Sequence, residues 1–257
     1  MSDAGLAAYL ERPLSPAAPG VMEAMDAPID PADALPREEM DRLLDPAPLP
    51  AENGWCVLPD GVAYVAARTA MPGVSAQMLD WWFHWHPDDP LRYRVWHPQA
   101  HISNRVERPA VAGAKLHWGT EHHPVEDVGT GVVHARIDFV RPSEIGFSSD
   151  ALDDPRVATI VCGWAGDDKL RVRHTPMVHV FLNDGDGVVL RSRFWLGAAL
   201  RPYAPALIAA PVGGLINNRF VRGRALPDGA PRGLARHCAE EYANLGALLP
   251  ELYARYG

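Results

Sequence analysis

The strongest periodic pattern of the chain lies in its last segment, PRGLARHCAEEYANLGALLPELYARYG (231–257). Apolar residues recur there at steps of three, four and seven, which predicts an amphipathic α-helix with one buried stripe. The stripe is formed by Leu234, Cys238, Leu245, Leu248 and Leu252. His237 and Glu241 lie on the same stripe one turn apart, so both side chains face the surface on which the helix packs.

A second pattern, of period two, predicts a sheet ahead of this helix. Residues 132–140 alternate best, with apolar side chains at the odd positions from 133 to 139 and polar ones at the even positions between them. Further strands are expected at 156–166, 170–184 and 187–197, the last two joined by a turn at 183–187. Because these strands follow one another closely, an antiparallel meander is the economical arrangement.

The remaining elements are shorter. WCVLPDGVAYVAART (55–69) predicts a hairpin, and Ser75 can cap a helix over 76–86 that precedes a second short helix around 91–97. Residues 106–131 predict a loop or a loosely formed hairpin, and Pro202 to Gly214 a short helix that covers a cavity. Residues 1–54 form a Pro-rich N-terminal arm with short helices, ahead of a body at 55–257, because nine of the 25 prolines fall within the first 50 residues.

Several strands followed by a long C-terminal helix indicate an α+β fold, in which a curved antiparallel sheet wraps the helix. Such a fold can leave a cavity between the sheet and the helix face that carries His237 and Glu241. Burying an unpaired carboxylate is costly, so this pair needs a cation, a strong hydrogen-bond partner or a metal. Helical His and Glu one turn apart suit Zn²⁺, whereas the alternative is a pair that binds only to itself or to an arginine.

Composition narrows the classes of function. A net charge of −8 and the lack of a Lys/Arg cluster argue against nucleic acid as a partner. No run of 18 apolar residues and no basic leader occurs, so neither a membrane span nor export is expected, and a cytoplasmic location follows. Three widely spaced cysteines indicate neither a disulfide framework nor a thiolate metal site.

Candidate chemistry gathers in residues 80–104, which are dense in Trp, Phe and His. His97, His101 and Asn104 fall in an irregular stretch around Pro98, where side chains converge on sites more often than on cores. For any single histidine here the alternative is a packed and hydrogen-bonded core residue.

Three phrases, RYRVWHPQAHISN (92–104), RSRFWLG (191–197) and HCAEEYANL (237–245), resemble the 2,4-diacetylphloroglucinol hydrolase family, which includes phloretin hydrolases. The resemblance covers about residues 55–257 and implies a Bet v1-like (START-type) helix-grip fold with one zinc ion in the cavity. It also implies hydrolysis of the carbon–carbon bond between an acyl group and a phenolic ring. The expected partner is thus a small acylphenol, and a homodimer is the oligomeric state considered.

The resemblance carries the zinc ligands of the family onto His101, His237 and Glu241, with a fourth from the middle of the chain. Glu126 is the preferred fourth ligand because it comes just ahead of the strong strand, while Glu121 and Glu144 compete with it. The catalytic positions that match are Tyr93, Asn104 and His179. Tyr93 and Asn104 are expected to stabilise an oxyanion, and His179 to carry protons.

One departure from the family stands in the RSRFWLG strand, where Phe194 replaces an expected tyrosine. One contact to a substrate phenol is then lost. Two other functions stay open: a non-catalytic helix-grip carrier of an apolar aromatic ligand, and a metal-dependent cyclase or decarboxylase. Metal content separates the carrier from the hydrolase, and release of a carboxylic acid separates the hydrolase from the cyclase.

Overall fold

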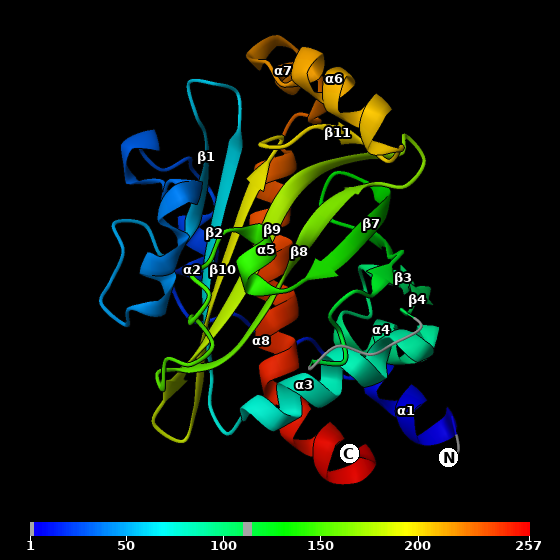
Figure 1. The fold of residues 1–257 in the computed structure, drawn as a ribbon. Coiled ribbons are helices and arrows are strands. Elements are labelled where there is room, and N and C mark those ends of the chain that lie inside the picture. The colour runs from blue at the N-terminus through cyan, green and yellow to red at the C-terminus, as the bar shows by residue number, and fades with distance from the viewer. Residues whose placement is uncertain (1–2, 110–114) are drawn as a thin grey trace.

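The structure is a computed structural model that describes residues 3–109 and 115–257. A long C-terminal helix, α8 (Ala230–Tyr256), lies against one face of a large antiparallel sheet (Figure 1). The main path of the sheet runs β1-β2-β10-β9-β8-β7-β5-β4. The long strands are β1 (Gly54–Val57), β2 (Ala63–Met71), β7 (Val132–Val140), β8 (Val157–Asp167), β9 (Val172–Asp184) and β10 (Gly187–Leu196). The predicted helix-grip fold is therefore confirmed.

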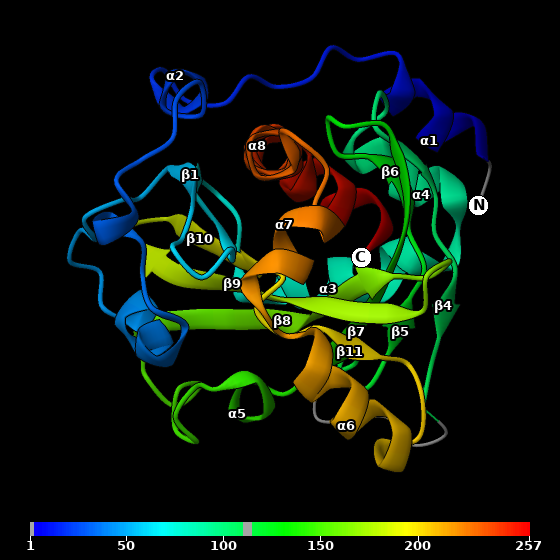
Figure 2. The same ribbon diagram turned by 90° about the horizontal axis from the view of Figure 1, so that it is seen from above.

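Shorter elements complete the sheet and cover its ends. The short strands are β3 (His101–Ser103), β4 (Val106–Glu107), β5 (Glu121–His122), β6 (Val125–Asp127) and β11 (Arg201–Pro202). The short helices of the body are α3 (Ala76–Trp85), η3 (His86–Asp88), α4 (Pro90–Trp96), α5 (Pro142–Ile145), α6 (Ala206–Ile216) and α7 (Arg219–Ala225). Figure 2 shows α8 on one side of the sheet, with α5 and α6 on the other.

The periodic patterns predicted the main elements well. The expected hairpin is β1 and β2, the strand at 132–140 is β7, and β8, β9 and β10 form the expected meander. Ser75 caps α3 through a hydrogen bond from the Met78 N–H. The segment expected as a loop or loose hairpin contains β4, β5 and β6, whose two or three residues are too short for a period to show.

The expected helix near Pro202 exists as α6, but it does not cover the inner cavity. It packs on β11 at the outer face of the sheet, and Leu207 and Leu215 are 92% and 78% exposed. This part of the prediction was wrong because the apolar residues of α6 point to solvent rather than toward α8. Within the described residues, no helix is both long and apolar enough to span a membrane.

The stripe of α8 packs on the sheet as its period predicts. Cys238, Leu245 and Leu252 are almost fully buried in the core between α8, α3 and the sheet. Gly246 allows the helix to approach β2, because a Cβ there would lie 3.1 Å from a side-chain carbon of Met71. Buried thiols are poor nucleophiles, and burial raises the pKa of Cys238 further.

The N-terminal arm contains α1 (Asp3–Leu10), α2 (Val21–Ala24), η1 (Pro31–Asp33) and η2 (Arg37–Leu44). Figure 2 shows it crossing from α1 beside α4, past α8, to the β1 edge. Tyr9 and Met25 are buried in the core around α8, while Met40 and Leu43 join a second core on the outer face of the sheet. The arm thus packs on the body along its length, and the domain boundary at residue 54 stays a prediction.

Candidate metal and catalytic site

Two helical residues begin the site. His237 and Glu241 project from the buried face of α8, and the Nε2 atom of His237 lies 3.8 Å from Oε2 of Glu241. Both side chains are buried because the stripe that carries them faces the sheet. A hydrogen bond from the ring N–H of Trp96 on α4 to the carbonyl oxygen of Glu241 fixes α8 at this position.

His101 enters from the opposite side, at the first position of β3. Its Nδ1 atom lies 3.0 Å from the carbonyl oxygen of Tyr93, which can only accept a hydrogen bond, so Nδ1 carries the proton. Its Nε2 atom faces inward, 3.4 Å from Oε2 of Glu126 and 3.5 Å from Oε2 of Glu241. This buried Nε2 atom has no hydrogen-bond partner among the described residues.

The sheet register places Glu126 in the same cluster. Glu126 lies on β6 directly opposite His101 on β3, and its Oε2 atom is 3.8 Å from Nε2 of His237. The turn after β6 rests on the first turn of α8 through a contact between Gly129 and Gly233. A Cβ on Gly233 would lie only 2.5 Å from the Val128 carbonyl oxygen, so glycine there lets β6 approach the helix.

The ligand atoms of His101, His237 and Glu241 all lie within 4.8 Å of one another, and Glu126 adjoins them. Burial lowers the pKa of His101 and of His237 to about 4, and it raises the pKa of Glu241 to about 8. Burial therefore disfavours the charged forms of these three side chains. A divalent cation would relieve this cost, because neutral imidazoles and ionised carboxylates are the forms that bind metal.

The two competing glutamates lie outside the cluster. Glu121 on β5 lies 2.8 Å from His123 and is paired with Arg136. Glu144 on α5 is exposed and lies 3.9 Å from Arg141. Of the three candidates for the fourth ligand, only Glu126 adjoins the two histidines.

An inner cavity of about 90 Å³ adjoins the cluster and contains the three predicted catalytic side chains. The Tyr93 hydroxyl donates a hydrogen bond to Glu126, and its ring stacks on His101 with centroids 4.1 Å apart. Asn104 is buried, and its Oδ1 atom has no partner among the described residues. His179 contacts Ser192 through Nδ1 at 2.8 Å, and burial lowers its pKa to about 3, so it is neutral at pH 7.

Two further histidines line the inner cavity, and sequence reasoning missed both. His86 is fixed by a hydrogen bond between Nδ1 and the Trp82 carbonyl oxygen, 2.8 Å apart. His122 lies 3.4 Å from Asn104 through Nδ1, and its Nε2 atom has no partner among the described residues. His122 is buried between the less buried Glu121 and His123, as the alternation of a strand requires, but β5 has only two residues and shows no period in the sequence.

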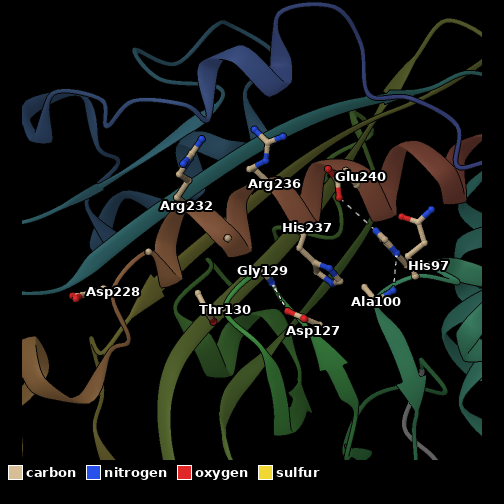
Figure 3. A pocket seen from close by; sticks show the side chains of 13 residues that line it. His97, Ala100, Asp127, Gly129, Thr130, Asp228, Arg232, Arg236, His237 and Glu240 are labelled. Atoms are coloured by element: carbon tan, nitrogen blue, oxygen red, sulfur yellow. Dashed lines mark hydrogen bonds and ion pairs between the residues drawn. The ribbon is translucent and has the colours of Figure 1, made fainter.

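A second, outer hollow of about 460 Å³ reaches His237 from the other side (Figure 3). His97 stacks on His237 there, with ring centroids 5.3 Å apart, and its Nε2 atom lies 3.6 Å from Glu240. Arg232 and Arg236 stand on the far side of α8 and reach Asp26 of the arm. His237 lines both hollows, so the outer one also borders the cluster.

The sequence matches the family described as DAPG hydrolase PhiG domain over residues 35–254. The chain belongs to this family. The phloretin hydrolase of Eubacterium ramulus is 34% identical over 211 residues, which cover 79% of this chain and 72% of that protein. The 2,4-diacetylphloroglucinol hydrolase of Pseudomonas protegens is 33% identical over 215 residues, which cover 80% and 69%.

These matches confirm the predicted family and the prediction that the chain is a hydrolase. Among solved structures, Ara h 8.0201 gives a TM-score of 0.43 at 8% identity, covering 74% of this chain and 99% of that one. Norcoclaurine synthase from Thalictrum flavum gives a TM-score of 0.36 at 11% identity, covering 77% and 90%.

Proposed function

We propose that this member of the DAPG hydrolase family hydrolyses the carbon–carbon bond between an acyl group and a phloroglucinol-like ring. The products are a carboxylic acid and the deacylated phenol. One Zn²⁺ ion would be held by His101, Glu126, His237 and Glu241. The identity of the metal and the bond cleaved are our inference, supported by family membership and by the donor set of the cluster.

One observation carries the metal assignment. His101 must donate its Nδ1 proton to the Tyr93 carbonyl, so in its neutral form Nε2 presents a lone pair. That lone pair faces oxygens of Glu126 and Glu241, which are themselves acceptors when ionised. A cation between the His101 nitrogen and the two carboxylate oxygens would satisfy all three acceptors. The nitrogen and oxygen donors, in a buried setting, fit Zn²⁺.

When bound, zinc would supply a Lewis acid for the acyl carbonyl and for the attacking water. The side chains of the inner cavity have separate tasks. Tyr93 donates its hydroxyl hydrogen bond to Glu126 and stacks on His101, so it holds these two proposed ligands in position. Asn104 offers an unused Oδ1 acceptor to a phenolic hydroxyl of the substrate. Neutral His179 can accept a hydrogen bond from a second hydroxyl of the ring.

The bond changes balance without a covalent enzyme intermediate. The ring carbon that bears the acyl group takes up a proton, and water adds to the acyl carbonyl carbon. The carbon–carbon bond then breaks, its electron pair returns to the ring, and the acid leaves with the oxygen from water. All three thiols are buried, so none is placed to form an acyl-enzyme.

The decisive test combines product identity with metal content. A panel of acylphenols is incubated with protein purified without a histidine tag, and mass spectrometry follows both fragments. We expect about one zinc per chain, and the labelled oxygen of H₂¹⁸O in the released acid. Zinc-free protein that still binds the panel without cleaving it, with or without added zinc, would identify a carrier instead. Loss of carbon dioxide, or an isomeric product, would identify a decarboxylase or a cyclase.

Substitutions at the helical pair test the ligands directly. Glu241→Gln and His237→Ala should lower zinc occupancy and turnover together, because each removes a ligand of the cluster. Glu251→Gln on the same helix is the matched control, since Glu251 is bound to Arg12 and lies outside the cluster. A Glu241→Gln protein with full zinc and unchanged turnover would contradict the proposed site.

A further inference from the structure

A second polar site lies on the outer face of the sheet, where β11 and α6 cover the side opposite α8 (Figure 2). It is a groove of about 530 Å³, here called the arginine groove. Its charged and aromatic lining is Arg136, Asp138, Arg171, Arg173, Arg201 and Tyr203. Arg136 and Asp138 alternate along β7 with Ile137 and Phe139, which line the inner cavity, so the sheet separates the two sites.

The sheet register places like charges against each other in this groove. Arg201 on β11 is directly opposite Arg173 on β9, a placement that destabilises a pair of strands when the charges are alike. Burial and then the charge of Arg201 lower the pKa of Arg173. Arg171, which also lines the groove, adopts a φ of 55°, a conformation uncommon for residues other than glycine.

None of these three arginines forms an ion pair with a carboxylate of the described residues. The ion pairs found there include neither Arg171, Arg173 nor Arg201. Asp138 is the acidic side chain in the lining; its charge acts on Arg173, and it already accepts a hydrogen bond from Arg136 at 3.0 Å. Three arginines without an ion pair are therefore gathered in a chain whose net charge is −8.

Aromatic rings hold two of the guanidinium groups in fixed positions. The guanidinium carbon of Arg173 lies 4.3 Å from the ring centre of Trp164, and that of Arg136 lies 3.9 Å from that of Tyr203. Stacking of this kind reduces the entropy that an arginine loses on binding. Planar guanidinium groups also match the oxygens of phosphates and carboxylates in pairs.

We propose that the arginine groove binds a small polyanion, either a phosphate ester or a polycarboxylate. The repulsion between Arg173 and Arg201 is relieved when such an anion lies between them. This site takes a ligand class different from an acylphenol, and its occupation does not depend on the function proposed for the inner cavity.

Isothermal titration calorimetry tests the proposal with two probes, fructose 1,6-bisphosphate and tricarballylate, which distinguish the phosphate source from the carboxylate source. Arg173→Gln and Arg201→Gln should each weaken binding of the better probe about tenfold, the loss expected for a hydrogen bond to a charged group. Arg94→Gln, at an exposed arginine on α4 outside the groove, should bind as the wild type does. Affinity should also fall as sodium chloride is raised.

Stability without a probe gives a second and independent readout. Arg201→Gln should raise the melting temperature, because it removes a like-charge pair, although the same change weakens binding. An arginine with a purely structural role would lower the melting temperature when replaced. The proposal is overturned if neither probe binds the wild-type protein, or if both groove variants bind as tightly as the wild type.

Discussion

Replacing Glu52 with glutamine should destabilise the whole protein, because this one carboxylate neutralises two buried arginines of β10. Its oxygens lie 2.6 Å from Nη2 of Arg191 and 3.2 Å from Nη2 of Arg193. The side chains of these arginines are only 2% and 0% exposed, so removing their counter-charge leaves two charges in the interior. Glu52 belongs to the arm, and the contact therefore measures how firmly the arm is joined to the sheet.

The expected loss is about 3 kcal/mol, at the lower end of the range for breaking a buried ion pair. The lower end applies because both guanidinium groups keep carbonyl partners. Arg191 donates to the Ala47 carbonyl oxygen at 2.8 Å, and Arg193 to that of Ala51 at 3.2 Å. For a chain of this length such a loss lowers the melting temperature by about 6–12 °C.

The effect should depend on pH. Burial alone raises the pKa of Glu52, but the Leu49 N–H and the charges of Arg193 and Arg191 outweigh it, so the pKa is lowered. A lowered pKa means that the contribution is complete above the unfolded-state pKa of about 4.3 and is lost as the pH falls through the folded-state pKa. The wild type and the Glu52→Gln variant should therefore differ fully at pH 7, begin to converge below about pH 4.3, and differ least below the folded-state pKa.

Urea unfolding followed by circular dichroism measures the loss of unfolding free energy and, when repeated at several pH values, its pH dependence. Glu39→Gln is the control, since Glu39 and its partner Arg42 are about half exposed and such pairs contribute below about 1 kcal/mol. If Glu52→Gln cost no more than this control, the buried contact would be no stronger than a surface pair. A separate early transition in the variant would instead show that the arm unfolds as a unit of its own.

Two other substitutions test how the site is built. Gly233→Ala should impair turnover and stability together, because its Cβ would meet the Val128 carbonyl oxygen at 2.5 Å and displace the turn after Glu126. Gly223→Ala on α7, which meets nothing within 4 Å, should be neutral or slightly stabilising, and equal melting temperatures for the two variants would refute the docking role of Gly233. Phe194→Tyr should change the relative kcat/KM values across a panel of acylphenols. Phe194 lines the inner cavity, and its ring centroid lies 5.5 Å from that of His179. If the order of kcat/KM values among the substrates did not change, this position would not select between them.

The fold could be predicted largely because its main elements are long. In β7 and α8 the apolar side chains recur with the period of the element, so the sequence shows both elements, and in α8 it also shows the buried face. Strands of two or three residues such as β5 and β6 have no room for a period, and they were expected only as a loop or loose hairpin. The direction in which α6 faces was also hidden, because its apolar residues continue around the helix without a polar face.

The site was predictable only where chemistry and period coincided. His237 and Glu241 could be predicted as site residues because polar side chains on the buried stripe of a helix need a polar partner. His101 was assigned as a ligand from the resemblance to the family. Glu126 could not be distinguished from Glu121 by spacing, because both lie in short strands just ahead of β7. What separates them is the pairing of β3 with β6, which places Glu126 opposite His101.

The pairing of β5 with β4 and with β7 places His122 in the same cavity as Asn104. His122 has a polar residue on each side in the sequence, Glu121 and His123, so the sequence shows no hydrophobic pattern here. In the structure the sheet turns the side chain of His122 inward and leaves its two neighbours less buried. The Nε2 atom of His122 and the Oδ1 atom of Asn104 then lie buried without partners among the described residues. Buried polar atoms of this kind are costly unless a partner satisfies them, and the phenolic hydroxyls of the proposed substrate would supply such partners.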